Sequence, residues 1–347
     1  MFGKLKIGNS MKIENWKLKI ILISLSFAFW VSGISASKVS AQGLSLGIYP
    51  PLLEVTIQPG KSITQVYKLS NGGETDLAMT SLIVPFEPSD EFGNIKLLSE
   101  SGSVSFRSNS VPFRNWFSFQ NADLALGQKF ILKSGKTQEI VLKVGVPKDV
   151  KEDDYYLTLL FETLPAQAGT APAEALGGGG STAQTQAKIG ANILLTVSQT
   201  GEPLRQAEIL EFRIKNNKFR IVDSFDKAEF LLRVKNTGKA FFKPIGTITT
   251  TGWFGQKYIL DLLPENVLVN SIRQIQCQMD DRVTPCQLPE KFLLGPYRAK
   301  MEFGLDKISN DYTAETIFWA IPAKLILALL TTIFILFIIK NRLKLPY

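Results

Sequence analysis

The stretch Leu53–Gly73, LEVTIQPGKSITQVYKLSNGG, decides the fold of this chain. Apolar and polar residues alternate on both sides of a turn, in which Pro59 and Gly60 take the central positions of a type II turn. An alternation with a period of two puts one set of side chains on a buried face and the other in water. The stretch therefore predicts two β-strands, the second of which ends at the turn residues Asn71–Gly73.

The same pattern recurs along the body of the chain. Short alternating segments, bounded by turn residues, are predicted at Leu77–Pro85, Ile140–Val146, Tyr155–Phe161, Ile189–Val197, Ile245–Thr251, Tyr258–Leu263 and Ile272–Gln278. No segment of the body has the 3.6-residue period of an amphipathic helix. The body is therefore predicted to be all-β and to consist of antiparallel sandwiches of the immunoglobulin type.

The second half of the body repeats features of the first. Phe230–Gly238 parallels Val66–Gly73, because each is a strand that runs into an Asn–Gly turn. Gly295–Phe303 parallels Asp154–Phe161, and each places a Tyr just after a turn, where a sandwich has its tyrosine corner. We therefore expect two tandem sandwich domains, at residues 42–200 and 201–312.

A segment rich in Ala, Gly, Pro, Thr and Gln, residues 164–188, interrupts the first predicted domain. It has the composition of an interdomain linker, but the apolar strand after it needs a partner and the strand before it is the nearest candidate. We therefore expect a disordered hairpin loop inside the first domain. A phosphate-binding Gly-rich loop is disfavoured, because no Lys–Ser/Thr pair and no helix follow it.

An apolar stretch of 23 residues, Ile317–Ile339, precedes a basic tail at residues 340–347. As a helix it would be about 34 Å long, which is enough to cross a membrane. We expect a single-pass transmembrane anchor, with a buried core helix as the alternative. The residues expected to position the anchor, as an interfacial aromatic, a snorkelling cation and the charges of the tail, are Trp319, Lys324, Lys340, Arg342 and Lys344.

Residues 1–41 have the pattern of a secretory signal peptide. Lys12, Lys17 and Lys19 form a positive region before the apolar run Ile20–Val31, and Val39–Ala41 offers small residues before a cleavage point. An uncleaved N-terminal anchor is the alternative. Since the signal exports the body and the basic tail stays inside, we expect a cell-membrane protein with an extracytoplasmic body and a cytoplasmic C-terminus.

The formal charge of +8 comes from the two ends of the chain. Residues 1–41 carry six Lys and one Glu, and residues 340–347 carry three cations, so residues 42–339 are formally neutral. A neutral body lacks the basic surface that binds a phosphate backbone. We therefore expect no nucleic-acid partner.

The chain has no His, which removes His-based acid–base catalysis and most zinc sites. The densest carboxylates, Asp153–Asp154 and Asp280–Asp281, are adjacent pairs whose side chains point to opposite faces of a strand. Both pairs lie beside turns, and we expect them to be solvated corner residues. We expect no enzymatic activity, no cofactor and no metal. A carboxylate-based enzyme and a weak calcium site at Glu152–Asp154 are the lesser alternatives.

Two further groups of residues are candidates for specific roles. Cys277 and Cys286 lie close together in a body predicted to be exported, so we expect a disulfide, with a free pair as the alternative. The candidates for contact with a partner are Trp253, Phe254 and Gly255, in a connection between strands, and the cluster Trp116, Phe117 and Phe119. The second cluster either stacks on sugars or belongs to the core.

The residues LGIYPPLLEV at Leu46–Val55, followed by Pro59–Gly60 and Tyr67–Asn71, are similar to the opening of PapD-like immunoglobulin domains. The order of signal peptide, PapD-like domain, second immunoglobulin-like domain, membrane span and basic tail resembles the bacterial WxL-interacting protein family. The motifs similar to those of its second domain are Asn236–Gly238, Lys243–Gly246 and Trp253–Gly255. Where its members often have a His near the Asn–Gly turn, this chain has Ala240, Phe241 and Phe242.

This resemblance implies peptidoglycan contact by the first domain and protein partners for the second. We therefore expect a non-catalytic, membrane-anchored surface scaffold or adhesion protein that binds cell-wall glycan or surface proteins. An extracytoplasmic assembly chaperone is the alternative, because PapD-like chaperones hold the terminal carboxylate of a subunit with a basic pair. Neither Ser45–Ile57 nor Ile189–Val197, the first and last strands of the first domain, contains a Lys or Arg that could supply such a pair.

Overall fold

The computed structural model describes residues 45–98, 113–164, 186–215, 220–280, 282–289, 292–307, 309 and 311–342. The expected signal peptide at residues 1–41, most of the expected loop at 164–188, and Lys344 lie outside these ranges. The chain divides into two units, Met1–Gly43 and Leu44–Tyr347, and the description below concerns the second unit.

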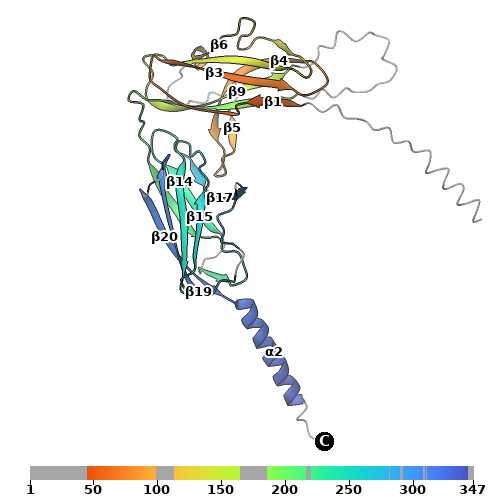
Figure 1. Ribbon diagram of the computed structural model, residues 1–347, viewed down its shortest axis with the longest axis vertical. Coiled ribbons are helices and arrows are strands. Elements are labelled where there is room, and N and C mark those ends of the chain that lie inside the picture. The colour runs from red at the N-terminus through yellow and green to blue at the C-terminus, as the bar shows by residue number, and fades with distance from the viewer. Residues whose placement is uncertain are drawn as a thin grey trace, which may run out of the picture. The chain divides into compact units, whose positions relative to one another are not determined.

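The first sandwich is built from ten strands in the described residues (Figure 1). They are β1 (Leu46–Tyr49), β2 (Leu52–Ile57), β3 (Ser62–Asn71), β4 (Leu77–Pro88), β5 (Ile95–Leu97), β6 (Phe117–Phe119), β7 (Phe130–Leu132), β8 (Thr137–Gly145), β9 (Asp153–Thr163) and β10 (Lys188–Val197), with the short 3-10 helix η1 (Phe113–Trp116) before β6. One sheet has the order β1–β3–β8–β6, and the other has the order β2–β10–β9–β4–β5, with β7 also paired to β4. The inward side chains of both sheets form one core, in which Tyr67, Leu142 and Phe161 are fully buried.

The first strand of this sandwich is divided between the two sheets. β1 pairs antiparallel with β3, the chain turns at Tyr49–Pro50, and β2 then pairs parallel with β10. β9 and β10 pair antiparallel along their whole lengths, starting from Glu162 opposite Lys188. The segment between β9 and β10 therefore connects the two strands of a hairpin within this sandwich.

The second sandwich contains ten more strands in the described residues. They are β11 (Ala207–Ile214), β12 (Ile221–Asp223), β13 (Phe230–Asn236), β14 (Pro244–Gly252), β15 (Lys257–Leu262), β16 (Ile272–Gln274), β17 (Cys277–Met279), β18 (Arg282–Thr284), β19 (Gly295–Leu305) and β20 (Tyr312–Ile321). Its sheets have the orders β11–β13–β16 and β12–β20–β19–β14–β15–β17–β18. Cys277 and Cys286 are joined by a disulfide within the core, with their Cα atoms 4.8 Å apart. The described residues thus form two immunoglobulin-like sandwiches, and the predicted all-β fold class is confirmed.

A buried asparagine closes the equivalent turn in each sandwich. Asn71 ends β3 and Asn236 ends β13, and in each the side-chain amide donates to two carbonyls while the amide oxygen accepts a glycine N–H, at distances of 2.8–3.2 Å. The partners are Thr75, Leu132 and Gly73 for Asn71, and Ala240, Val267 and Gly238 for Asn236. Each asparagine therefore satisfies backbone groups that the turn would otherwise bury without partners.

The two tyrosines expected at corners also bond to nearby backbone. The Tyr155 hydroxyl donates to the carbonyl of Lys151 at 3.3 Å, and the Tyr297 hydroxyl accepts the N–H of Leu294 at 3.3 Å. Both tyrosines are buried, so the hydroxyl ties a turn to the strand that follows it.

The C-terminal helix begins later than the sequence predicts. Ile317–Ile321 belongs to β20, in which Phe318 and Ala320 are buried and Trp319 faces outward. The helix α2 (Ala323–Arg342) starts after Pro322, so the predicted start at Ile317 is wrong. The strand is favoured because β19 and β12 pair with β20 on its two sides, while Phe318 fills the core.

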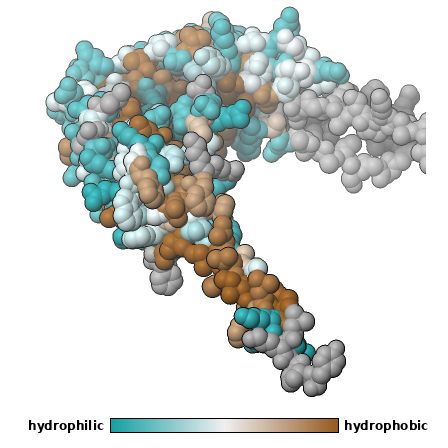
Figure 2. Space-filling view, turned by 60° about the horizontal axis from the view of Figure 1, so that its bottom comes forward, coloured by the Kyte–Doolittle hydropathy of each residue, from teal (hydrophilic) through white to brown (hydrophobic). Residues whose placement is uncertain are grey.

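α2 has no buried residue, and its surface is apolar over most of its length (Figure 2). Among the described residues it is the one helix that is long and apolar enough to cross a membrane. Twenty residues span about 30 Å, which matches the thickness of the hydrocarbon core. A transmembrane role is therefore consistent with its length and composition.

The asparagine turn gives a first prediction. Asn236→Ala should lower the free energy of unfolding by about 3 kcal/mol, because two buried carbonyls and one buried N–H lose their partner. Urea unfolding of the full chain in detergent measures this change. The neighbouring substitution Lys235→Ala serves as the control and should change stability by less than about 0.5 kcal/mol. Equal effects of the two substitutions would contradict the role assigned to the asparagine.

Candidate functional site

A buried carboxylate, that of Asp154 at the start of β9, joins the two sandwiches. Its Oδ2 accepts hydrogen bonds from the Tyr156 hydroxyl at 2.8 Å and from the N–H of Phe241, in the second sandwich, at 2.5 Å. Its Oδ1 accepts the hydroxyl of Thr196, on β10, at 2.6 Å. The Tyr156 hydroxyl in turn accepts the N–H of Val269 at 2.9 Å. A continuous set of hydrogen bonds therefore links β9 and β10 to two segments of the second sandwich.

Apolar side chains surround these hydrogen bonds. Phe86, Tyr156, Leu194, Phe241 and Leu268 form a buried cluster, in which the rings of Phe86 and Tyr156 stack with their centroids 5.8 Å apart. Burial raises the pKa of Asp154 to about 6, although the hydrogen bonds from Thr196, Tyr156 and Phe241 act in the opposite direction. The expectation that Asp154 is a solvated corner residue is therefore wrong, because the second sandwich covers it.

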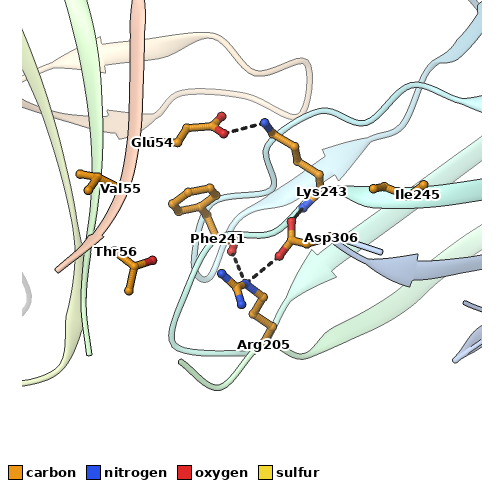
Figure 3. Close-up of a pocket in the computed structure, with 8 residues that line it drawn as sticks. All are labelled: Glu54, Val55, Thr56, Arg205, Phe241, Lys243, Ile245 and Asp306. Carbon is orange, nitrogen blue, oxygen red and sulfur yellow. Dashed lines mark hydrogen bonds and ion pairs between the residues drawn. The ribbon is translucent and has the colours of Figure 1, made fainter. Parts of the chain in front are cut away.

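Beside this cluster lies an open pocket of about 300 Å³ (Figure 3). It is lined by Glu54, Val55 and Thr56 of β2 and by Arg205, Phe241, Lys243, Ile245 and Asp306 of the second sandwich. The Lys243 ammonium donates to Glu54 at 2.6 Å, and the Arg205 guanidinium pairs with Asp306 at 2.7 Å. Each cation that lines the pocket is therefore already paired with a carboxylate.

Further hydrogen bonds hold these ion pairs in place. Asp306 also accepts the backbone N–H of Lys243 at 2.8 Å, and Glu54 also accepts the side-chain amide of Asn266 at 2.5 Å. An incoming anion would have to compete with Glu54 for Lys243 and with Asp306 for Arg205. The arrangement therefore works as an ionic clamp between β2 and the second sandwich, and a partly exposed pair of this kind contributes about 1 kcal/mol or less.

The hairpin of β4 and β5 makes a third contact between the sandwiches. Glu91, between the two strands, accepts two hydrogen bonds from the guanidinium of Arg233 on β13, with Nε at 2.8 Å. The backbone carbonyl of Glu91 accepts the N–H of Gln274, on β16, at 2.8 Å. A two-pronged guanidinium–carboxylate pair fixes orientation as well as distance. The two sandwiches are thus held by polar contacts at three separate places.

The first half of β10 has an open edge. β2 pairs with β10 only from Asn192 onward, so no described strand is hydrogen-bonded to the outer side of Lys188–Ala191. The N–H of Asn192 donates to the carbonyl of Pro51, on the β2 side. Because peptide groups alternate along a strand, the N–H and C=O groups of Lys188 and Gly190 face the same open side. Such an edge can pair with an added strand.

Apolar side chains beside this edge are incompletely covered. Leu46 and Ile48 of β1 and Ile189 of β10 pack against the core of the first sandwich but remain partly exposed. The outer face of the open half of β10 is polar, because Lys188 there is paired with Glu162 at 2.6 Å. No local pattern in the sequence indicates this edge, since the edge depends on where β2 starts relative to β10.

The aromatic cluster in η1 and β6 belongs to the core. Trp116 and Phe117 are buried in the first sandwich, and Phe119 packs against the same cluster while partly exposed. The rings of Trp116 and Tyr155 meet edge to face with their centroids 5.0 Å apart. The prediction of partner contact is therefore wrong for Trp116 and Phe117, because both side chains fill the space between the sheets.

The other aromatic group is exposed. Trp253 and Phe254 lie between β14 and β15, are 72% and 69% exposed, and stack with their ring centroids 6.3 Å apart. Gly255 has a φ of 80°, which a residue without a side chain adopts at little cost. These side chains are available for contact with another molecule, and the nature of that contact stays a prediction here.

The adjacent carboxylates at Asp153–Asp154 and at Asp280 belong to no cluster of acidic side chains that could hold a metal ion among the described residues. Asp153 is half-buried beside Asp154, and Asp281 lies outside the described residues, so the pair Asp280–Asp281 is not described as a whole. Within the described residues, no group of three or more Cys, Asp and Glu side chains is arranged to hold a metal ion. The chemistry of the described site is therefore hydrogen bonding and ion pairing between the sandwiches.

The start of α2 is tied to the second sandwich. The carboxylate of Asp223 accepts the backbone N–H of Lys324 at 3.0 Å, and backbone hydrogen bonds of this kind lower the pKa of Asp223. The Lys324 ammonium, expected to reach lipid headgroups, pairs with Asp226. Lys340 and Arg342 lie in the last turn of α2, as expected of charges that follow an apolar span.

No protein-family model and no curated protein matches the chain. Among solved structures, it is similar to the class 5 fimbriae chaperone CfaA, with a TM-score of 0.35, 10% identity and coverage of 79% of this chain and 99% of the other. It is also similar to the E. coli chaperone DraB, with a TM-score of 0.33, 11% identity and coverage of 80% and 98%. A third is the Pseudomonas aeruginosa CupB2 chaperone, with a TM-score of 0.30, 10% identity and coverage of 77% and 97%.

These TM-scores are below 0.5, so the fold is assigned from the strand order of the chain itself. A first strand divided between an antiparallel pairing in one sheet and a parallel pairing with the last strand in the other defines the first sandwich as PapD-like. The resemblance to the WxL-interacting family stays a prediction.

The buried carboxylate makes stability depend on pH. The pKa of Asp154 rises from its ordinary 3.8 to about 6 in the folded chain, so between these values the folded state binds a proton that the unfolded state has lost. The contribution of Asp154 to the free energy of unfolding should therefore be greatest below about pH 4, fall by about 3 kcal/mol as the pH rises to about 6, and then level off.

Asp154→Asn should remove this component of the pH dependence. It should also weaken the junction, because the amide has one accepting oxygen in place of two, so either Thr196 or the pair of Tyr156 and Phe241 loses its acceptor. Urea unfolding of the full chain in detergent, repeated across this pH range, measures both effects. Asp149→Asn, which changes an exposed carboxylate five residues away, is the control and should keep the wild-type pH profile. Identical profiles for the wild type and Asp154→Asn would contradict the burial assigned to Asp154.

Proposed function

We propose that this chain is a membrane-tethered, non-catalytic surface scaffold whose first sandwich holds an extended segment of another envelope protein. The observation that carries the proposal is the open edge at Lys188–Ala191, beside the partly covered side chains of Leu46 and Ile48. A strand added there would satisfy the outward peptide groups of Lys188 and Gly190. It would also remove apolar surface from water.

The link to α2 supports a stationary role. β20 ends at Ile321 and α2 begins at Ala323, so Pro322 alone separates the sandwich from the helix. Asp223 caps the first turn of the helix from the side of the sandwich. We place the body outside the cell and the end of α2 in the cytoplasm, because Lys340 and Arg342 follow the apolar stretch.

The junction between the sandwiches supports a scaffold that holds the first sandwich away from the membrane. Lys243 and Asp306, which take part in the ionic clamp, lie where β14 starts and β19 ends, at the end of their sheet opposite to the start of α2. β14 has nine residues and therefore spans about 30 Å. The first sandwich is thus held on the second at a fixed distance from the helix, which suits a scaffold that presents a binding edge above a membrane.

An assembly chaperone is the second candidate, and the divided first strand with the open edge of β10 favours it. Two features favour the scaffold instead. Lys243 and Arg205 are already paired with carboxylates, so the carboxylate of a subunit would have to compete with Glu54 and Asp306 for them. The outer face of the open half of β10 carries Lys188 and Gly190, whereas a strand donated to an unfinished core needs apolar side chains.

Lys188→Pro tests the edge. It removes an outward N–H and leaves the hydrogen bonds to β9 intact, because Lys188 turns its peptide groups away from β9. Lys188→Ala is the matched control, since it loses the ion pair with Glu162 but keeps the N–H. Wild type and both variants, as full chains in lipid nanodiscs, are immobilised and exposed separately to surface-protein extract and to purified cell wall.

We expect Lys188→Pro to weaken capture of a surface protein about tenfold and Lys188→Ala to change it less than about twofold, as the loss of one strand hydrogen bond predicts. Equal capture by all three would contradict the proposed edge. Capture of cell wall alone would assign the chain to glycan binding. A captured protein that is protease-sensitive throughout, and is released on folding, would favour the chaperone.

A further inference from the structure

Four segments of the second sandwich meet where α2 begins. β12 runs parallel to β20, and the N–H of Ser224 just after it donates to the carbonyl of Ile321 at 3.0 Å. β19 starts opposite the end of β20, with Gly295 facing Ala320. β14 ends beside the start of β19, with Gly252 facing Tyr297, so the hairpin of β14 and β15 lies at this end as well (Figure 1).

This end of the sandwich carries a group of exposed aromatic side chains. They are Phe225 after β12, Trp253 and Phe254 between β14 and β15, Phe292 before β19, and Trp319 near the end of β20. The rings of Phe225 and Phe292 lie edge to face with their centroids 5.2 Å apart. Each of the five is at least 48% exposed, so none is needed to fill the core. Exposed aromatic side chains gathered at one end of a domain indicate a site of contact.

The register of the strands orders these residues relative to α2. The N–H of Trp253 donates to the carbonyl of Pro296, and Pro296 faces Trp319, so Trp253, Pro296 and Trp319 form one row on the outward face of the sheet. The next row away from α2 contains Lys257, Thr251 and Arg298, which are all exposed. The aromatic row is thus nearest the helix, and a row with two cations lies about 7 Å behind it.

We propose that this end of the second sandwich is a lipid-contacting surface. Its five aromatic side chains lie at the boundary between headgroups and acyl chains, and Lys257 and Arg298 lie at the level of the phosphates. Lipid is the occupant because these side chains lie at the end of the sandwich where α2 begins, two residues after β20 ends, and the apolar surface of α2 reaches the sandwich there (Figure 2). Tryptophan is enriched at this boundary, and cations behind it suit anionic headgroups.

The aromatic residues lie on both sides of β20, and lipid contact there would affect the orientation of the sandwich on its helix. Phe225 follows β12, on one side of β20, whereas Trp253 lies beyond β19 on the other side. Contact with lipid on both sides restricts tilting of the sandwich on its helix. The proposal rests on the membrane span of α2 in the proposed function, and it is independent of the open edge of β10.

Fluorescence quenching by lipid tests the proposal. The full chain is reconstituted into vesicles of equal parts phosphatidylcholine and phosphatidylglycerol, with or without bromine on the acyl carbons nearest the headgroups. The difference in emission between the wild type and Trp253→Phe isolates the signal of Trp253. We expect brominated lipid to reduce this signal about twofold, as a ring at the headgroup–acyl boundary requires. Trp116→Phe is the matched control, because Trp116 is buried in the first sandwich and its signal should not change.

Phe225→Trp provides a second position on the other side of β20, and its added emission should be quenched to a similar extent. Flotation of the vesicles separates the possible failures. A chain that floats but whose Trp253 and added Trp signals are unquenched would overturn the lipid contact and leave the anchor intact. A chain that does not float would overturn both. Protection of Trp253 from a soluble quencher by envelope extract alone would assign it to a protein partner and also overturn the proposal.

Discussion

A carboxylate held away from water, that of Asp154, is the interaction on which the arrangement of the two sandwiches depends. Removing a carboxylate from water is costly, and the cost is offset only while all of its donors stay in place. Two of the three donors belong to the first sandwich and one belongs to the second. Any separation of the sandwiches would leave the carboxylate short of a partner, so the apolar cluster and the hydrogen bonds around it hold together as one unit.

β10 connects the proposed binding edge with this junction. Its first residues, from Lys188, form the open edge, whereas Leu194 packs in the junction cluster and Thr196 donates to Asp154. A partner strand at this edge would therefore pair alongside β10, whose far end is fixed by the second sandwich. The binding edge is thus part of a rigid strand and not of a separate loop, which limits the entropy lost on binding.

Local patterns in the sequence were enough to predict most of the fold. Alternation predicted the strands, the Asn–Gly pattern predicted the turns closed by Asn71 and Asn236, and the position after a turn predicted the corner role of Tyr155. These features succeed because each depends on residues that are neighbours along the chain. The disulfide was likewise predicted from a local feature, the short spacing of Cys277 and Cys286.

The features that escaped prediction all depend on distant contacts. Asp154 beside a turn has the pattern of a solvated residue, and it is buried by Phe241, which is 87 residues away. The ionic clamp joins Glu54 to Lys243 across 189 residues. Ile317–Ile321 is apolar enough for either a helix or a strand, and only its pairing with β19 decides between them. The edge of β10 likewise follows from register, which no single segment encodes.

The direct passage from β20 into α2 has a mechanical consequence. A pull between the membrane and the first sandwich acts along β20, because Pro322 alone separates the strand from the helix. The hydrogen bonds from β20 to β19 and β12 lie across this direction, so they carry the load together, in shear, and do not open one after another. In a chain anchored by α2 as we propose, tension would therefore pass from the bilayer into a paired sheet without a compliant linker to absorb it.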